Sequence, residues 1–271
     1  MPELPEVETT RRGISQRLLG YKVERVLIRE RRLRWPVPPS IEANLAGETI
    51  LAVDRRGKYL LLRTARGAAI LHLGMSGSLR IVRADLAPRK HDHFDIRMNT
   101  GDILRFNDPR RFGCLLWTNE DPAMHPLLSS LGPEPLSDEF TGAYLHSSGR
   151  HRRVAIKPHL MNAGVVVGVG NIYANEALFR AGVHPKRAAG RIAAVRMERL
   201  ATEIKVVLTE SIRAGGTTLR DFYDGDGRPG YFRHDLRVYG RDGQPCPKCR
   251  APIRQIVLGQ RSTFYCATCQ R

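Results

Sequence analysis

The sequence predicts an α+β protein with antiparallel β-structure in its N-terminal part and helices in its C-terminal part. Three observations support this prediction. Short apolar runs fill residues 22–118, helical periodicity follows at 171–214, and four of the five cysteines lie within the last 26 residues. A chain of 271 residues is long enough for two modest domains.

The first element expected is a helix over residues 5–19. Pro5 suits the first turn of a helix, and Gly20 can end it. One side would be apolar, with Val7, Ile14 and Leu18. The amine of Pro2 would therefore lie at or just before a helix N-terminus, where the helix dipole disfavours the charged ammonium form.

Seven short apolar runs between residues 22 and 118 are expected to form strands. Their spacing near ten residues and the turn residues between them are typical of an antiparallel sandwich or barrel. The runs are 49–53, 59–63, 69–73, 78–82, 94–98, 103–106 and 114–117. Residues 119–150 are rich in Pro, Gly, Ser and Asp, which favours a connection between domains.

The second half is expected to hold two main helices and a long loop. One helix would span Asn171 to Ala181, closed by Gly182. The other would span 192–214, with one apolar face made of Val195, Leu200, Ile204, Val207, Leu208 and Ile212. The five glycines of 215–233 predict a loop, which is either a functional lid or a tolerated insertion. Asn171 is either a plain N-cap or a phosphate contact at the helix start.

The net charge indicates a polyanionic partner. Forty-four Lys and Arg against 27 Asp and Glu leave a net charge of +17. Nucleic acid is favoured over the alternative of a generally basic composition. No run is long and apolar enough for a membrane span or a signal peptide, so we expect neither.

The terminal cysteines predict a structural zinc site. Cys246-x2-Cys249 and Cys266-x2-Cys269 would supply four thiolates to one tetrahedral ion, leaving no open position for catalysis. The residues between these pairs favour a hairpin with Arg261 near its tip. Cys114 is expected to be a small buried apolar residue, and the whole cysteine pattern fits a reducing cytosol.

Several residues have both an ordinary and a functional interpretation. Without Met1, Pro2 would be a secondary amine able to form an iminium ion, with Glu3 beside it to handle protons. The ordinary interpretation is that Pro2 is a proline before a helix with no chemical role. Met75 and Phe112 stand on loops beside arginines, a pattern that suits wedging between base pairs, although each alone could be a core residue. Lys58 alone suggests a solvated turn residue.

Longer motifs carry a family resemblance over essentially the whole chain. They are MPELPEVET (1–9), RLRWP (32–36), RRGKYLLL (55–62), HLGMSGSLR (72–80), KHDH (90–93), DPRRFG (108–113), LGPEPL (131–136), VVGVGNIYANEALF (166–179), the GGTTLRDF loop and QRSTFYC (260–266). The chain resembles the bacterial formamidopyrimidine-DNA glycosylases, which are bifunctional glycosylase/AP lyases of base-excision repair.

The resemblance implies a set of domains. They are an N-terminal catalytic β-sandwich (1–130), a linker (131–150), a helix–two-turns–helix DNA-binding domain (151–235) with a lesion-capping loop (215–233), and a zinc finger (236–271). Damaged double-stranded DNA would run between the domains, with an oxidised purine extruded. The resemblance also leads us to expect a monomer in the bacterial cytoplasm.

The resemblance also implies residue roles. Pro2 would attack the sugar, Glu3 would protonate the ring oxygen, and Lys58 and Arg261 would assist the β- and δ-eliminations. The DNA backbone would be held by His72, His91, Arg110, Arg152 and Asn171. The space left by the extruded nucleotide would be filled by Met75, Arg110 and Phe112. The alternatives are an endonuclease VIII-type glycosylase for oxidised pyrimidines and a non-enzymatic zinc-finger DNA-binding protein.

Overall fold

The computed structural model describes residues 2–216 and 236–271. Met1 and most of the predicted 215–233 loop therefore lie outside the described residues. The chain divides into two compact units. Among the described residues, the first unit holds 2–129 with 214–216, and the second holds 130–213 with 236–271.

The first helix, α1, spans Leu4–Leu18, one residue earlier at each end than the sequence predicts. Glu3 is its N-cap, a proline stands in its first turn, and Gly20 follows it with a φ of +81°. The expected apolar side is buried in the core and consists of Val7, Ile14 and Leu18. Local start and stop signals therefore placed this helix correctly.

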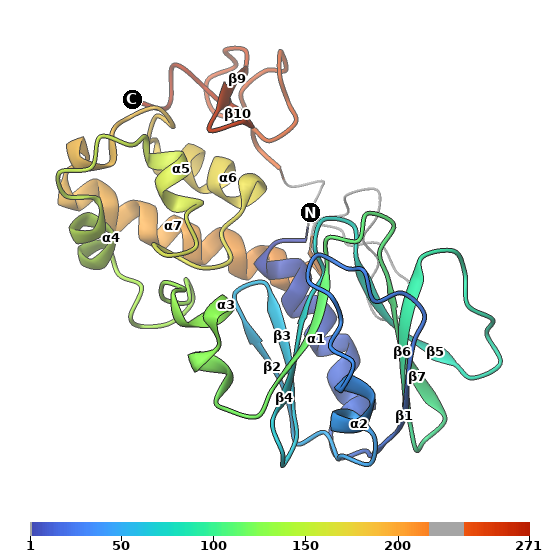
Figure 1. Cartoon of the computed structure of the whole chain (residues 1–271). Helices are drawn as coiled ribbons and strands as arrows, with labels where there is room; N and C mark the ends of the chain where they lie inside the picture. The colour runs from blue at the N-terminus through green and yellow to red at the C-terminus, as the bar shows by residue number, and fades with distance from the viewer. Residues whose placement is uncertain (1, 217–235) are drawn as a thin grey trace. The chain divides into compact units, whose positions relative to one another are not determined.

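Two antiparallel four-stranded sheets build the rest of the first unit (Figure 1). One has the order β1 (Val23–Ile28), β6 (Asp92–Met98), β7 (Asp102–Asn107), β5 (Ser78–Arg83). The other has the order β2 (Ala52–Arg56), β3 (Tyr59–Arg63), β4 (Ala68–His72), β8 (Cys114–Thr118). A single apolar core draws on both sheets, which makes the predicted β-structure a sandwich and not a closed barrel.

Helices pack against both sheets of the sandwich. Helix α1 contacts β2 and β3 of one sheet and β5 of the other, and α2 (Ile41–Leu45) contacts β1 and β8. A short 3-10 turn (Pro122–Met124) and α3 (Pro126–Ser129) follow the last strand. The first strand predicted, 49–53, is displaced to 52–56 because Thr49 instead bridges to Lys22.

The second unit is built around two long helices and a terminal hairpin. Helix α6 spans Asn171–Ala181 and α7 spans Ala194–Arg213. They pack together, with α4 (Gly142–Gly149) against α7 and β10 (Arg261–Tyr265) against α6. The smaller elements are α5 (Ile156–Leu160), a 3-10 turn (Ala189–Arg191), β9 (Arg254–Leu258) and β10 (Arg261–Tyr265). None of the helices in the described part of the chain combines the length and apolarity that a membrane span requires.

Two details of the predicted second half are wrong. Part of the expected linker 131–150 is helix α4, which Thr141 caps by accepting from the Tyr144 N–H, and which buries Leu145. Val195 is 76% exposed, although the sequence placed it on the buried face of α7. It precedes Leu200 by five residues, which rotates it about 140° away from that face.

Candidate active site and metal centre

The N-terminal pair lies at the start of α1. Pro2 and Glu3 are both buried, and Glu3 is only 2% exposed. The Glu3 N–H donates to the Glu6 carboxylate at 2.8 Å, and the Glu3 carboxylate accepts from the Glu6 N–H. This reciprocal capping box fixes the backbone on both sides of Glu3 and places its carboxylate at the positive end of the helix. The position of Pro2 is thereby set by the helix that follows it.

Lys58 lies in the two-residue turn between β2 and β3. Gly57, the first turn residue, has a φ of +58°, as this kind of hairpin turn requires. The Arg55 side chain donates to the Gly57 carbonyl at 2.9 Å and to Glu8 of α1 at 3.1 Å. The turn that carries Lys58 is therefore fastened to the helix that begins beside Pro2.

His72 ends β4, next to the turn of Lys58. It pairs with Tyr59 on one side and Cys114 on the other, and the Tyr59 and His72 rings are 4.8 Å apart. Burial, together with the positive charges of Lys58 and Arg34, lowers the pKa of His72 to about 4. Its Nδ1 accepts the Gly74 N–H at 2.8 Å, so the neutral ring carries its proton on Nε2. His72 can thus donate a hydrogen bond without carrying charge.

Two irregular loops carry the predicted wedge residues. Met75 lies in the turn after β4, and Arg110 and Phe112 lie between β7 and β8. The Arg110 guanidinium stands 4.9 Å from the centre of the Phe112 ring, and Phe112 is 41% exposed. The Phe112 ring is therefore exposed with a cation stacked against it, and the wedge role of these residues stays a prediction. Nearby, His91 adopts a left-handed backbone with a φ of +72°.

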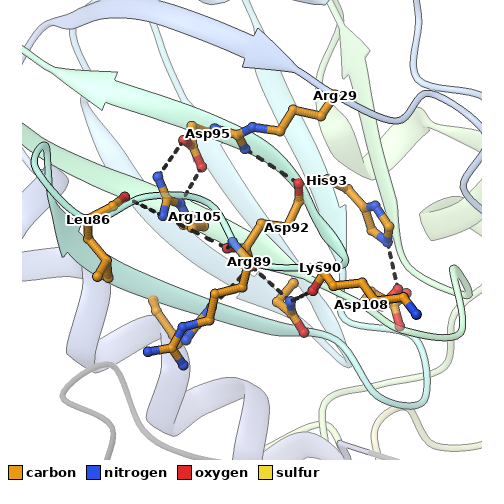
Figure 2. A network of polar contacts seen from close by, with 11 residues as sticks. Arg29, Leu86, Arg89, Lys90, Asp92, His93, Asp95, Arg105 and Asp108 are labelled. Atoms are coloured by element: carbon orange, nitrogen blue, oxygen red, sulfur yellow. Dashed lines mark hydrogen bonds and ion pairs between the residues drawn. The ribbon is translucent and has the colours of Figure 1, made fainter.

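A buried charge network surrounds Asp92 and Asp95 on β6 (Figure 2). The Arg105 guanidinium donates to both oxygens of Asp95 at 2.9 Å, and Arg29 also donates to Asp95. Asp92 accepts the Arg89 N–H at 2.7 Å, which closes the loop before His91. Because these pairs are satisfied, the buried charges fix the strand ends instead of weakening them. The sequence prediction missed this network, although Asp92 and Asp95 within an apolar strand were a visible signal.

In the second unit, Asn171 is the first residue of α6 but does not cap it. The N-cap is Gly170, which has no side chain to offer, so the plain N-cap interpretation of Asn171 is wrong. The Asn171 amide instead donates to the Ser262 carbonyl at 3.1 Å. Asn171 therefore lies beside the strand that Arg261 begins. Arg152 is exposed, in a turn whose backbone bonds to Gly149 and Gly190.

Arg261 is exposed at the first position of β10, directly after a turn in which Gly259 and Gln260 have φ values of +59° and +57°. The strand behind it is held by buried polar groups of the second unit. Lys157 Nζ donates to the Ser262 carbonyl at 2.9 Å and to Thr263 Oγ1 at 2.6 Å. The hairpin prediction is confirmed. Sequence reasoning assigned Lys157 no role and missed its place in the interior.

The four terminal cysteines meet around one point. Their Sγ atoms all lie within 4.8 Å of one another, with Cys246 to Cys269 at 3.9 Å and Cys249 to Cys266 at 3.4 Å. Thiolates at tetrahedral positions about 2.3 Å from zinc would stand about 3.8 Å apart, whereas a disulfide would bring two sulfurs to about 2 Å. The donor set therefore fits a closed, structural zinc site.

Comparisons with known proteins agree with this geometry. Family models match residues 1–115 (formamidopyrimidine-DNA glycosylase N-terminal domain), 131–223 (its H2TH domain) and 243–271 (zinc finger found in FPG and IleRS). A formamidopyrimidine-DNA glycosylase of Nitrosococcus oceani is 57% identical over 270 residues, and one of Methylococcus capsulatus is 57% identical over 271. Both matches cover 100% of each chain.

The chain belongs to the formamidopyrimidine-DNA glycosylase family. Solved structures agree. The MutM (Fpg) protein of Thermus thermophilus is 38% identical, with a TM-score of 0.89 and coverage of 99% of this chain and 98% of that one. A Lactococcus lactis FPG mutant in complex with Fapy-dG-containing DNA is 32% identical, with a TM-score of 0.93 and full coverage of both chains.

Membership of the formamidopyrimidine-DNA glycosylase family makes the protein a DNA glycosylase of base-excision repair, and AP lyase activity is typical of the family. The predicted α+β fold, with its sandwich, H2TH domain and zinc finger, is confirmed. The cofactor is one structural zinc ion held by Cys246, Cys249, Cys266 and Cys269.

Proposed function

We propose that the protein excises oxidised purines, 8-oxoguanine and formamidopyrimidines, with Pro2 as nucleophile, and then nicks the strand by β- and δ-elimination. The observation that carries this proposal is the placement of Pro2 directly before the capping box that Glu3 forms with Glu6 at the start of α1. A secondary amine held beside a carboxylate is the pair that imine chemistry at a sugar carbon needs.

The proposed chemistry begins at the sugar of an extruded nucleotide. The Pro2 nitrogen forms a bond to C1′ and loses its own proton. The N-glycosidic bond breaks with its electron pair leaving on the base, which takes up that proton. Glu3 gives its proton to the ring oxygen O4′, so the C1′–O4′ bond opens and an iminium ion joins Pro2 to the sugar. The iminium then acidifies the C2′ proton.

Two eliminations follow from that iminium ion. Loss of the C2′ proton, with Lys58 assisting its transfer, expels the 3′ phosphate. A second elimination, which Arg261 assists, expels the 5′ phosphate, and water releases the sugar fragment from Pro2. Cations beside both leaving phosphates would lower the cost of the charge that develops on them.

The remaining predicted residues would hold the DNA. His72, His91, Arg152 and Asn171 would contact the backbone, which matches the neutral donor geometry of His72 and the exposure of Arg152. Met75, Arg110 and Phe112 would fill the space left by the extruded nucleotide, and the donor fork of Arg110 would face the unpaired base. Because such contacts release counterions, binding should weaken steeply with salt.

The proposal requires removal of Met1. While Met1 is attached, the Pro2 nitrogen is a tertiary amide whose lone pair is delocalised into the carbonyl. The active form should begin at Pro2. Mass spectrometry that finds Met1 on fully active enzyme would rule out Pro2 as the nucleophile.

Borohydride trapping tests the nucleophile. Reduction should join the protein covalently to DNA that contains 8-oxoguanine, and Pro2→Gly should reduce the adduct sharply, whereas Pro5→Ala, a matched change inside α1, should not. Equal adduct with Pro2→Gly would overturn the assignment. No adduct with any form would favour a non-enzymatic DNA-binding protein.

Nicking of duplexes that carry 8-oxoguanine or thymine glycol, each opposite every base, tests the substrate class. Preference for thymine glycol would favour the endonuclease VIII-type alternative. We further propose that the protein acts as a monomer in the cytoplasm. The four-thiolate zinc site supports a reducing compartment. Sedimentation velocity would test the monomer, and a dimer at micromolar concentration would contradict it.

A further inference from the structure

Asp108 joins three loops of the first unit through its backbone and side chain. It is fully buried and follows β7 directly. Its N–H donates to the His91 carbonyl at 3.0 Å, and its own carbonyl contacts His93 Nε2 at 2.7 Å (Figure 2). The backbone of Asp108 is thus fixed against the segment that carries His91.

The Asp108 carboxylate binds the other two loops. Oδ1 accepts the Ser76 hydroxyl at 2.7 Å and the Arg110 N–H at 3.3 Å, and Oδ2 accepts the Gly113 N–H at 2.8 Å. Ser76 follows Met75 directly, while Arg110 and Gly113 enclose the segment with Phe112. One buried charge therefore links residues that lie 32 positions apart in the sequence. Hydrogen bonds to a charged acceptor are among the stronger ones in a protein.

The two wedge loops also touch through their backbones. Gly74 has a φ of +67°, and a Cβ there would stand 2.4 Å from the Phe112 carbonyl carbon and 2.5 Å from the Gly113 nitrogen. No side chain fits between the loops at this point. The turn with Met75 and the segment with Phe112 therefore lie in direct contact. The hydrogen bond from Ser76 to the buried Asp108 carboxylate holds the same two loops together.

We propose that Asp108 is a positioning residue that holds Met75, Arg110 and Phe112 as one preformed wedge for duplex DNA. This inference rests on the proposed function, which places those three side chains in the space of the extruded nucleotide. Asp108 does not touch DNA. The Asp108 carboxylate already holds the two irregular loops in place before DNA binds. The conformational entropy of ordering them is therefore not lost when the duplex is opened.

The proposal predicts that a variant with a misplaced wedge loses cleavage activity only on DNA that has a strand opposite the lesion. A duplex leaves a hole and an unpaired base when the lesion is extruded, so a misplaced wedge should slow its cleavage. A single-stranded oligonucleotide with an aldehydic abasic site has no hole to fill, and its cleavage needs only the Pro2 chemistry. A residue that merely stabilises the fold would affect both substrates alike.

The experiment compares Asp108→Asn and Ser76→Ala in the full-length, zinc-loaded protein. Asp108→Asn should lower cleavage of an 8-oxoguanine duplex by about tenfold to a hundredfold, the range expected when catalytic geometry shifts by about 1 Å. It should leave cleavage of the single-stranded abasic oligonucleotide within about twofold of wild type. Ser76→Ala, which removes only the bond across the loops, should show the same selective loss to a smaller extent.

Asp95→Asn is the matched control. It weakens a buried pair with Arg105 in the same sheet without touching either wedge loop. It should reduce stability but keep the ratio of duplex to single-strand activity. A duplex containing 2-aminopurine opposite a stable abasic analogue adds a direct readout of the wedge, because insertion of a side chain changes base stacking and so the fluorescence.

Each outcome separates the inference from the proposed function. If wild type fails to trap on DNA, the proposed function fails. If wild type is active and Asp108→Asn loses nothing on duplex, or loses as much on the single strand, the positioning role is wrong while the proposed function stands. If Asp108→Asn does not fold, Ser76→Ala decides by the same ratio.

Discussion

Arg55 on β2 binds Glu8 on α1, with Nε 3.1 Å from Glu8 Oε2. The same Arg55 side chain holds the turn before Lys58, so this ion pair sets the distance between the start of α1 and the Lys58 turn within the first unit. Glu8 also accepts from Arg11 at 2.9 Å and Arg12 at 2.8 Å. One buried carboxylate therefore serves three guanidinium groups.

The first prediction concerns the acid stability that Glu8 confers. Burial raises the pKa of Glu8, but the hydrogen bonds from Arg11 and Arg12 outweigh burial and lower it from 4.5 to about 2. A lowered carboxylate pKa stabilises the fold above pH 4.5, and this contribution is lost as the pH falls towards 2. Glu8→Gln should therefore lower the free energy of unfolding at pH 7 by about 3 kcal/mol.

Urea unfolding between pH 2 and pH 7 measures this effect. The difference between wild type and Glu8→Gln should shrink as the pH falls through the range 4.5 to 2. Glu24→Gln is the control, because Glu24 pairs with Arg97 at the exposed surface and should contribute little. A difference that stays constant with pH would show that Glu8 stabilises by packing and not by charge.

The second prediction concerns the protonation of His72. Because burial and two nearby cations lower its pKa to about 4, His72 should remain neutral down to about pH 5, unlike an ordinary histidine near 6.5. The unfolded chain takes up this proton below pH 6.5 while the folded one does not, so the stability contribution falls as the pH drops from 6.5 to 4. The imidazole NMR resonances of His72, assigned through His72→Gln, should show no titration above pH 5. A midpoint near 6.5 would contradict the Nδ1 contact with Gly74.

Local signals explain how much of the fold the sequence could predict. Helix α6 was predicted with both ends correct, because Gly182 adopts the left-handed conformation that ends helices. Helix α4 was missed because its glycines and serines favour loops, and only the contact with α7 makes it helical. The intrinsic helix propensity of these residues therefore predicted a loop, whereas tertiary packing makes the segment a helix.

At the site, too, residues in contiguous motifs could be predicted from the sequence, whereas residues with distant partners could not. The cysteine pairs could be recognised from their spacing alone. The roles of Pro2 and Arg261 come from the family resemblance of the contiguous motifs that contain them, and they stay proposals. Asp108 and Lys157 could not, because their partners lie 32 and more than 100 positions away in the sequence. A charge buried by folding looks like a surface charge in the sequence unless its neighbours are strongly apolar.

The third prediction concerns the metal. Two of the four cysteines, Cys246 and Cys266, belong to an apolar cluster with Phe179, Val238, Ile253 and Phe264. Metal binding contributes on the order of 10 kcal/mol to the folding of such sites. Chelation should therefore unfold the hairpin and abolish strand cleavage, and added zinc should restore it. Elemental analysis should give one zinc per chain, and cleavage that survives complete removal of zinc would contradict the structural role.

The fourth prediction concerns Glu176, which anchors the segment before the zinc site. Its carboxylate accepts three consecutive backbone N–H groups, from Arg237, Val238 and Tyr239, at 2.8–2.9 Å. Glu176→Gln keeps the shape but turns an amide N–H towards at least one of these donors. Because an unsatisfied buried donor costs about 1–3 kcal/mol, thermal unfolding should begin at a lower temperature. Glu198→Gln on α7 is the control, and equal melting of both variants would contradict the anchoring role.

The last prediction concerns the strand that presents Arg261. Asn175 is buried in α6, accepts the Phe264 N–H at 2.8 Å and donates to the Asn171 carbonyl at 2.6 Å. Asn175→Ala leaves the Phe264 N–H unpaired, at a cost of about 1–3 kcal/mol, and removes one of the hydrogen bonds that join β10 to α6. Under the proposed role of Arg261, the fraction of product that has undergone δ-elimination should fall, while base release changes little.

Denaturing gels that separate the β-elimination product from the 3′-phosphate product measure this fraction. Arg261→Ala should produce the same shift in product ratio by removing the group itself. Asn44→Ala is the matched control, because the Asn44 side chain makes an exposed contact with Ser40 in the first unit. Equal loss of base release and δ-elimination in Asn175→Ala would show that Asn175 supports the whole second unit and does not place Arg261. If Arg261→Ala leaves the ratio of the two elimination products unchanged, Arg261 does not assist δ-elimination.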